Sequence, residues 1–324
     1  MYGSPVDPVI LDDVDSGLLH ALQIDGRASM RQIAATLDVS ENTAARRYRR
    51  LRSTGALRVI GALDGARLGY ETWVVRLRAT PDAALPLALA LARRDDTSWI
   101  YLVSGGTEVV AAVQAPSAGT RDALLLRELP RTEQVLAITA QVLLAGFALP
   151  SDWGGLTHLD PDRAAALRPP PVEEDDSPLT LEPADEPLLA ELLRDGRTSS
   201  VELAARTGWS VSTVRRRIAH LRATGLLSFQ LDVVPEVLGL RAQARLWLSV
   251  APADLVETAT RLAAHPDVTF VSATTGATNL VATAACRDNR ALYRLLTEHL
   301  GGVRDVETAP VVRTIKRGGA LLPR

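Results

Sequence analysis

An internal repeat constrains this chain of 324 residues more than any other feature of its sequence. When the sequence is set against itself at an offset of 170 residues, 15–57 lies over 185–227 without a gap. The identical pairs are Leu18 with Leu188, Gly26 with Gly196, Ala34 with Ala204, Ser40 with Ser210, Thr43 with Thr213, Arg46 with Arg216, Leu51 with Leu221 and Gly55 with Gly225. After a slip of one residue the match continues more weakly, with 80–81 over 251–252 and 105–108 over 276–279. Solenoid units have about 20–50 residues, so a longer period predicts a two-domain protein duplicated head to tail, in the order A-B-A′-B′.

The segment between the two copies differs in composition from both of them. Residues 151–183 carry eight acids and two arginines, which leaves a net charge of +4 on the rest of a chain whose total is −2. The segment is also rich in proline, as in RPPPVEEDDSP. We therefore expect 150–184 to be a solvated linker. The predicted domains are A at 12–63, B at 64–149, A′ at 185–232 and B′ at 233–318.

Composition excludes several classes of protein. With 47% hydrophobic and 23% charged residues, the chain resembles an ordinary folded protein. No apolar run has the 18 or so residues that a membrane span needs, and the start MYGSPVDPVILDD has no secretory pattern. We expect a cytoplasmic protein without a membrane partner. Cys286 is the only cysteine and is expected to be a buried packing residue, and neither it nor the five scattered histidines suggests a metal site or a catalytic centre.

Both A modules have the pattern of a helix-turn-helix unit. Leu18, Leu19 and Leu22 have the spacing of one short helix, and Ile33, Ala34 and Leu37 have that of a second. Ser40 and Ser210 are suitable N-caps for a third helix. The preceding turn has Asp38 in one copy and Gly208 in the other, and both tolerate a positive φ. The third helices should bury Ala44, Tyr48 and Leu51, and Val214, Ile218 and Leu221, and the β-prone runs LRVIGAL and LLSFQLD suit a following wing strand.

The outward faces of the two third helices are rich in arginine, and this favours DNA binding. All basic residues except Lys316 are arginine, so the alternative of a merely solvated face has to be weighed. A capped third helix with cations on its outer face is typical of a recognition helix in the major groove. Hydroxyl groups of the first turn and arginines one turn later would contact bases or phosphates. The sequence does not separate the arginines that contact bases from those that contact phosphates. The candidate DNA-binding residues are Ser40, Thr43, Arg46, Arg47, Arg50, Ser210, Ser212, Thr213, Arg215, Arg216 and Arg217.

Each B module has the element order βαββαβ. Residues 72–79 alternate like a half-buried strand and 82–93 have a helical pattern, followed by two strands, a helix at 117–129 and a last strand. The second copy matches this order. Such a sheet carries its helices on one face, so its other face needs a cover. We expect B and B′ to cover each other as an intramolecular pseudo-dimer, and the fold class is α+β with two winged helix-turn-helix domains and two ferredoxin-like domains.

The sequence resembles the Lrp/AsnC (leucine-responsive regulator) family of transcription regulators, in a tandem-duplicated form. The resemblance rests on three motifs. They are DxxLLxxLxxDGRxS at 15–29 and 185–199, the helix-turn-helix that follows it, and RxxGxL at 52–57 and 222–227. The resemblance implies a nucleoid-associated regulator that binds double-stranded DNA and pairs its B domains sheet to sheet. We also expect further homo-oligomers and no cofactor. The resemblance also implies that an amino acid or related metabolite binds at B interfaces beside a G-x-x-D loop. The corresponding candidates are Gly105, Thr107, Glu108, Gly276, Thr278 and Asn279, although neither copy keeps the Asp, and an ordinary hairpin turn is the alternative.

Two other functions compete with a DNA-binding regulator. Sirohaem decarboxylases also resemble this family and use the B interface as a catalytic pocket. A ligand-sensing scaffold that does not bind DNA is a third interpretation. An enzyme has no need of two arginine-rich third helices, so we expect a regulator that is not an enzyme and has no catalytic residues.

Overall fold

The computed structural model describes residues 10–149, 153–172 and 179–321. The acidic run at 173–176 lies outside the described residues. The chain forms two compact units, and each unit combines two stretches that are distant in sequence. Of the described residues, 10–68 assemble with 156–172 and 179–238, and 69–149 and 153–155 assemble with 239–321. The two A modules thus share one unit and the two B modules share the other.

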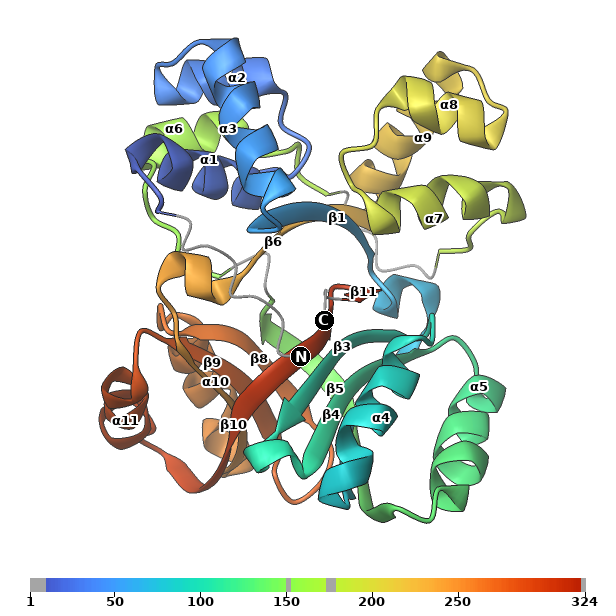
Figure 1. Cartoon of the computed structure of the whole chain (residues 1–324), viewed down its shortest axis with the longest axis vertical. Coiled ribbons are helices and arrows are strands. Elements are labelled where there is room, and N and C mark those ends of the chain that lie inside the picture. The colour runs from blue at the N-terminus through green and yellow to red at the C-terminus, as the bar shows by residue number, and fades with distance from the viewer. Residues whose placement is uncertain (1–9, 150–152, 173–178, 322–324) are drawn as a thin grey trace. The chain divides into compact units, whose positions relative to one another are not determined.

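The first unit holds the two helix-turn-helix modules that the sequence predicts. Their elements are α1 Asp13–Ile24, α2 Met30–Leu37, α3 Glu41–Ser53 and β1 Leu57–Leu63, and then α7 Glu186–Arg194, α8 Ser200–Thr207, α9 Val211–Ala223 and β6 Leu227–Val233 (Figure 1). Ser40 and Ser210 cap α3 and α9 by accepting from the backbone N–H groups of Thr43 and Thr213. Asp38 and Gly208 have φ values of 54° and 73°. Both predicted caps and both predicted left-handed residues are therefore confirmed.

The two strands predicted as wings pair with each other across the modules. β1 and β6 form an antiparallel ribbon that runs from Leu57 opposite Val233 to Leu63 opposite Leu227. Each strand is followed by a 3-10 turn, Ala66–Leu68 or Pro235–Leu238. Among the described residues, neither module supplies a second strand for a hairpin wing of its own. Both predicted wing strands therefore form, and each satisfies its backbone hydrogen bonds by pairing with the strand of the other copy.

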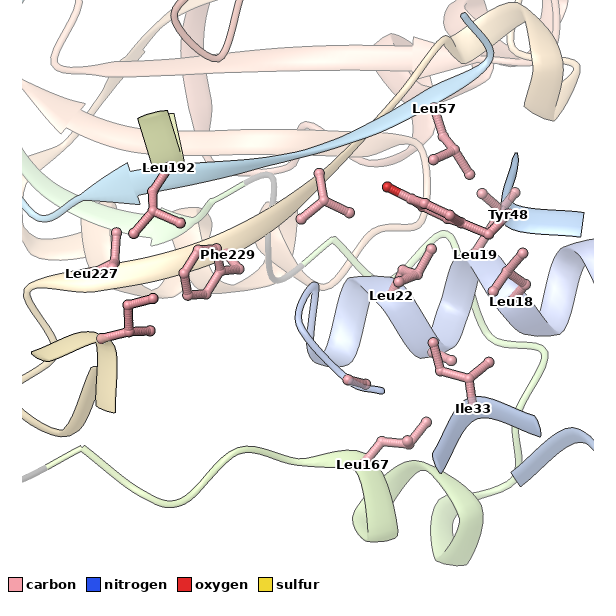
Figure 2. Packing of buried hydrophobic residues seen from close by; sticks show 14 of the residues in the cluster. Leu18, Leu19, Leu22, Ile33, Tyr48, Leu57, Leu167, Leu192, Leu227 and Phe229 are labelled. Atoms are coloured by element: carbon pink, nitrogen blue, oxygen red, sulfur yellow. The ribbon is translucent and has the colours of Figure 1, made fainter. Parts of the chain in front are cut away.

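The segment predicted as a solvated linker is partly buried. It contains α6 Pro161–Leu167, and Leu159 and Leu167 are 8% and 4% exposed in the core of the first unit. Figure 2 shows Leu167 among the buried side chains of this core, together with Ile33 and Leu18. The imidazole Nδ1 of His20 accepts a hydrogen bond of 2.8 Å from the backbone N–H of Leu159. Two apolar residues thus anchor a stretch whose overall composition suggested only solvent contact.

The second unit holds two βαββαβ modules, as the sequence predicts. The first copy comprises β2 Glu71–Ala79, α4 Pro81–Ala92, β3 Thr97–Val103, β4 Glu108–Ala115, α5 Ala118–Asp122, a π-helical turn Ala123–Glu128 and β5 Val135–Ala148. The second copy comprises β7 Ala242–Val250, α10 Leu255–Ala263, β8 Val268–Thr274, β9 Leu280–Cys286, α11 Asn289–Glu298, β10 Val303–Arg317 and a short β11 Ala320–Leu321. The thiol of Cys286 is buried, which raises its pKa to about 12 and confirms a packing role for this residue.

The two sheets of the second unit close on each other. The strand order is β11-β10-β3-β4-β2-β5-β8-β9-β7, and β10 also pairs with β7, which closes the ring. Val74, Tyr101 and Val110 of the first copy share a core with residues of the second copy, namely Trp247, Val281 and Ala309. Separate apolar clusters lie between each sheet and its own helices. The predicted sheet-to-sheet pairing of B with B′ is therefore confirmed within one chain.

Among the described residues, no helix combines the length and the apolar character needed to cross a bilayer. Within the same part of the chain, no group of three or more His, Cys, Asp or Glu residues is arranged to hold a metal ion.

Candidate nucleic-acid interface and effector pocket

The first turns of α3 and α9 present hydroxyl groups at the surface. The Ser40 hydroxyl lies 2.9 Å from the Thr43 hydroxyl. In the second copy, the Ser210 hydroxyl lies 2.8 Å from both the Ser212 and the Thr213 hydroxyls. These side chains cap the helix and also leave further donor and acceptor positions toward solvent. The structure therefore places all five predicted hydroxyl residues at a helix N-terminus, where backbone N–H groups add an anion-binding character.

Three of the predicted arginines are exposed and have no partner in the part of the chain that the structure describes. Arg46 on α3, and Arg215 and Arg216 on α9, are exposed and make no hydrogen bond or ion pair with any described residue. They follow the hydroxyl-bearing first turns by about one helical turn. A guanidinium without a protein counterion keeps all of its donors available for a phosphate or a base edge.

Arg47 and Arg50 differ from this group, because both bind a buried carboxylate in their own module. The Asp15 side chain on α1 is fully buried, and its Oδ2 lies 2.5 Å from Nη2 of Arg50 and 3.5 Å from Nη1 of Arg47. Arg47 also contacts Asp12, the N-cap of α1, at 2.7 Å. The two arginines thus hold the N-terminus of α1 against α3. Arg47 and Arg50 keep 27% and 42% of their side chains exposed, but part of their donor capacity is used within the module and not on its outer face.

Arg217 has the same role in the second copy. It donates to both carboxylate oxygens of Asp185, at 2.7 and 2.5 Å, and Asp185 is 1% exposed. These hydrogen bonds raise the pKa of the Arg217 guanidinium. His220 stands where the first copy has Arg50, so a single arginine and not two neutralises the buried acid. The repeat itself held the signal for these pairs, since Asp15 and Asp185 match at an offset of 170 residues as Arg47 and Arg217 do.

The predicted effector loop of the first copy borders a cavity in the second unit. The loop joins β3 to β4 and contains Gly105, whose φ is 69°. The cavity has a volume of about 360 Å³ and is lined by Arg76, Arg78, Thr107, Glu108, Ala137, Thr139 and Glu307. Arg76 bridges Glu108 and Glu307, at 2.7 and 2.5 Å, and these hydrogen bonds raise its pKa. Arg78 is 67% exposed at its side chain, and its nearest acid is Glu108 at 3.8 Å.

The corresponding loop of the second copy is closed by protein side chains. The Asn279 amide donates to and accepts from the backbone of Val250, both at 2.9 Å. Gln141, from the first copy, inserts its Nε2 amide and donates to the backbone oxygens of Thr275 and Thr278, each at 2.7 Å. Trp247 and Ser249 stand where the first copy has Arg76 and Arg78. Of the six predicted effector residues, the structure thus places Gly276, Thr278 and Asn279 in a loop whose polar groups already have partners.

Comparisons with known proteins agree with this architecture. The family model of the AsnC-type helix-turn-helix domain matches residues 11–52 and 184–222, and that of the Lrp/AsnC ligand binding domain matches 243–321. The leucine-responsive regulatory protein of Rhizobium meliloti is 31% identical over 136 residues, which cover 39% of this chain and 85% of that protein. This chain belongs to the Lrp/AsnC family. The HTH-type transcriptional regulator FL11 of Pyrococcus furiosus is 28% identical over 137 residues, which cover 42% of this chain and 90% of FL11.

The same Lrp/AsnC architecture also occurs in an enzyme. The solved structure of the siroheme decarboxylase NirDL superimposes with a TM-score of 0.64 at 14% identity, over 94% of this chain and 93% of NirDL. At that identity the likeness concerns the fold. It nevertheless overturns the prediction that a chain of this organisation is not an enzyme, because a catalyst has the duplicated fold over almost the whole length.

Proposed function

We propose that this Lrp/AsnC family member is a sequence-specific, DNA-binding transcription regulator in which both helix-turn-helix modules of one chain contact the same duplex. The observation that carries the proposal is the pair of capped helices, α3 and α9, each with exposed arginines that have no partner among the described residues. A capped helix with free guanidinium groups one turn from its start suits the major groove.

The structure supports a division of labour among the candidate residues. We assign direct DNA contact to Ser40, Thr43, Arg46, Ser210, Ser212, Thr213, Arg215 and Arg216, because these side chains are at the surface of α3 and α9. Arg47, Arg50 and Arg217 support the interface by holding the third helices on Asp15 and Asp185. Their remaining donors are partly exposed and would add phosphate contacts of lower weight.

The proposal is tested by equilibrium binding of the full chain to the DNA upstream of its own gene, compared with a shuffled duplex of equal length. Specific binding is typically 10³–10⁷ times tighter than binding to unrelated DNA at physiological salt. Equal affinities for the two duplexes would contradict the proposal. A titration with sirohaem in the same buffer, followed by absorption, tests the alternative separately, because an enzyme of the sirohaem decarboxylase type would have to bind this tetrapyrrole.

We expect the two modules to read different half-sites. Their outward positions differ at Ala45 against Arg215, Arg49 against Ala219, and Arg50 against His220. In vitro selection from a random duplex library should therefore give an asymmetric site, with half-sites separated by about one helical turn, roughly 34–36 Å, or a multiple of it. Recovery of a perfectly palindromic site would contradict the prediction that the two modules recognise different half-site sequences.

We also propose that the effector of this regulator binds in the cavity of the first copy. The match to the Lrp/AsnC ligand binding domain lies at 243–321 in the second copy, and the first copy repeats the same βαββαβ order, so a small-molecule effector is expected for this pair of modules. Arg78 offers an exposed guanidinium at the cavity, while Glu108, Glu307 and two threonine hydroxyls offer acceptors, an arrangement that suits a small amphoteric molecule such as an amino acid. The second copy offers no such open site, since Gln141 and Asn279 occupy its polar groups.

The expected stoichiometry is therefore one effector per chain. We would screen the proteinogenic L-amino acids by thermal shift and titrate the best one by calorimetry. A ligand at 100 times its Kd stabilises the folded state by about 2.7 kcal/mol. Arg78→Ala should abolish the shift, and Ser249→Ala, the matched change in the second copy, should leave it. Two equivalent sites per chain, or no response to any of these probes, would contradict this assignment.

A further inference from the structure

The tripeptide Asp-Gly-Arg occurs once in each copy, at 25–27 and 195–197, in the turn before the second helix of each module. Neither turn belongs to the first-turn residues or free arginines of α3 and α9. Each turn instead contacts the other module of the same unit. Arg27 donates to the backbone oxygens of Gly196 and Thr198 at 2.7 and 3.3 Å. Arg197 donates reciprocally to the oxygens of Gly26 and Ala28 at 2.6 and 3.0 Å.

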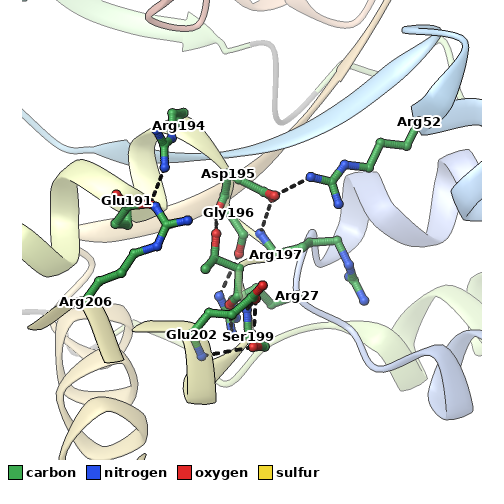
Figure 3. Close-up of polar contacts among 11 residues, drawn as sticks. Arg27, Arg52, Glu191, Arg194, Asp195, Gly196, Arg197, Ser199, Glu202 and Arg206 are labelled. Atoms are coloured by element: carbon green, nitrogen blue, oxygen red, sulfur yellow. Dashed lines mark hydrogen bonds and ion pairs between the residues drawn. The ribbon is translucent and has the colours of Figure 1, made fainter. Parts of the chain in front are cut away.

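The aspartates of the two tripeptides extend this exchange to the recognition helices. Asp195 binds Arg52 of α3 at 2.5 Å, and Asp25 binds Arg222 of α9 at 3.0 Å. Figure 3 shows Arg52 reaching Asp195 from α3, with Arg27 and Arg197 beside it. Both helix-borne arginines lie in the last turn of their helix. The C-terminal end of each recognition helix is therefore tied to the tripeptide of the other module.

The glycines allow the tripeptides to lie directly on the β1–β6 ribbon. A Cβ atom at Gly26 would lie 2.8 Å from the backbone oxygen of Phe229, and one at Gly196 would lie 2.9 Å from the backbone carbon of Ile60. The backbone N–H of Gly196 donates to the Val59 oxygen at 2.8 Å. Both collisions would involve backbone atoms, which cannot move aside as a flexible side chain can. The close approach thus requires glycine at both positions.

Each tripeptide arginine is also fixed by an aromatic ring. The Arg27 guanidinium lies 5.1 Å from the centre of the Phe229 ring, and Arg197 lies at the same distance from the Tyr48 ring. Burial and the nearby Arg197 lower the pKa of Arg27 to about 10. A planar guanidinium that donates to two backbone oxygens and stacks on a ring has little freedom to move. The hydrogen bonds to backbone oxygens are thus exchanged between the repeat-equivalent arginines, whereas the rings are not equivalent, since the repeat aligns Phe229 with Val59 and Tyr48 with Ile218.

We infer that the two Asp-Gly-Arg turns form a reciprocal clamp, which fixes the separation of α3 and α9 and thereby selects the spacing of the DNA half-sites. Arg27 and Arg197 act as positioning residues. The consequence for DNA rests on the proposed function, whereas the fixed separation of the helices does not. A rigid pair of recognition helices accepts half-sites only on the same face of the duplex, and insertion of about half a helical turn places them on opposite faces.

The separation of the helices is tested first without DNA. Spin labels at Asn42→Cys and Ser212→Cys, which are exposed and equivalent positions on α3 and α9, report the distance distribution by double electron–electron resonance. The buried Cys286 thiol stays unlabelled. We expect a narrow distribution in the wild-type background and at least a doubled width in Arg27→Ala/Arg197→Ala. An equal width in both proteins would overturn the clamp.

The spacing of half-sites is tested on a selected site with a series of insertions between its halves. A 5-bp insertion should lower the affinity of the wild-type chain for the site at least tenfold. The same insertion should lower the affinity of Arg27→Ala/Arg197→Ala by less than about threefold. Affinity for a single half-site should be the same for both. Arg194→Ala is the matched control, since this arginine pairs with Glu191 of its own helix, and it should behave as wild type.

If the double alanine variant loses helical circular dichroism, Arg27→Lys/Arg197→Lys replaces it, because lysine keeps the charge without the two-pronged donor geometry. If the wild-type chain binds no DNA specifically, the proposed function is refuted. The distances between the spin labels would still show whether the two turns fix the separation of α3 and α9. A wild-type chain that binds all insertions equally would overturn the inference.

Discussion

Arg217→Ala is expected to lower the free energy of unfolding of the helix-turn-helix unit by about 2–3 kcal/mol. The substitution removes both strong donors from Asp185, which is 1% exposed, and leaves a buried charge with little compensation. Breaking a buried pair from one side costs about 3–5 kcal/mol, and the partial exposure of Arg217 reduces this. Urea denaturation followed by circular dichroism measures the effect. Arg216→Ala, one residue earlier and without a partner among the residues that the structure describes, should stay within about 0.5 kcal/mol of wild type.

The first copy supplies a further check on this prediction. Arg47→Ala should cost about half as much as Arg217→Ala, because Arg50 still lies 2.5 Å from the Asp15 carboxylate. The difference arises from a single position, where the second copy has His220. Equal losses for the two variants would show that Arg50 does not compensate, and would contradict the account of the buried acids.

The double substitution Arg46→Glu/Arg216→Glu is expected to abolish most of the specific DNA affinity while leaving the stability nearly unchanged. Each arginine that contacts a base edge is worth about 1–3 kcal/mol, and each phosphate contact contributes about 0.9 to the slope of log affinity against log salt. The slope should therefore fall by roughly 2 if both contacts are to phosphates. Fluorescence anisotropy over a salt series measures both quantities.

Arg194→Glu provides the control for charge. Arg194→Glu changes the net charge by the same amount as either Arg46→Glu or Arg216→Glu alone. Arg194, however, lies on α7 and pairs with Glu191. The variant's affinity and salt slope should stay near those of the wild type. Equal effects of Arg194→Glu and of the double variant would mean that net charge, and not α3 and α9, governs binding.

The sequence predicted those features that depend on local patterns. The caps at Ser40 and Ser210 and the positive φ at Asp38 follow from residues within one turn, and the structure confirms them. The βαββαβ order and the need for a covering sheet follow from periodicity over short segments, and the closed ring of strands confirms both.

The features that the sequence did not reveal depend on contacts between distant segments. Helical periodicity places Arg47 on an outward face, but it cannot show that the Asp15 carboxylate, 32 residues earlier in the chain, binds the Arg47 guanidinium. The pairing of β1 with β6 and the insertion of Gln141 beside Thr278 both join one copy to the other. Self-comparison reveals that two copies exist, but it does not reveal which residues of one copy contact the other.

One chain is proposed to bind a single duplex with both of its helix-turn-helix modules. Hydroxyl-radical footprinting of the wild type, Arg46→Glu and Arg216→Glu on one selected duplex tests this claim most directly. We predict two protected tracts for the wild type, about one helical turn or a multiple of it apart, and the loss of a different tract in each variant. A wild-type chain that protects a single tract, or two variants that lose the same tract, would contradict it.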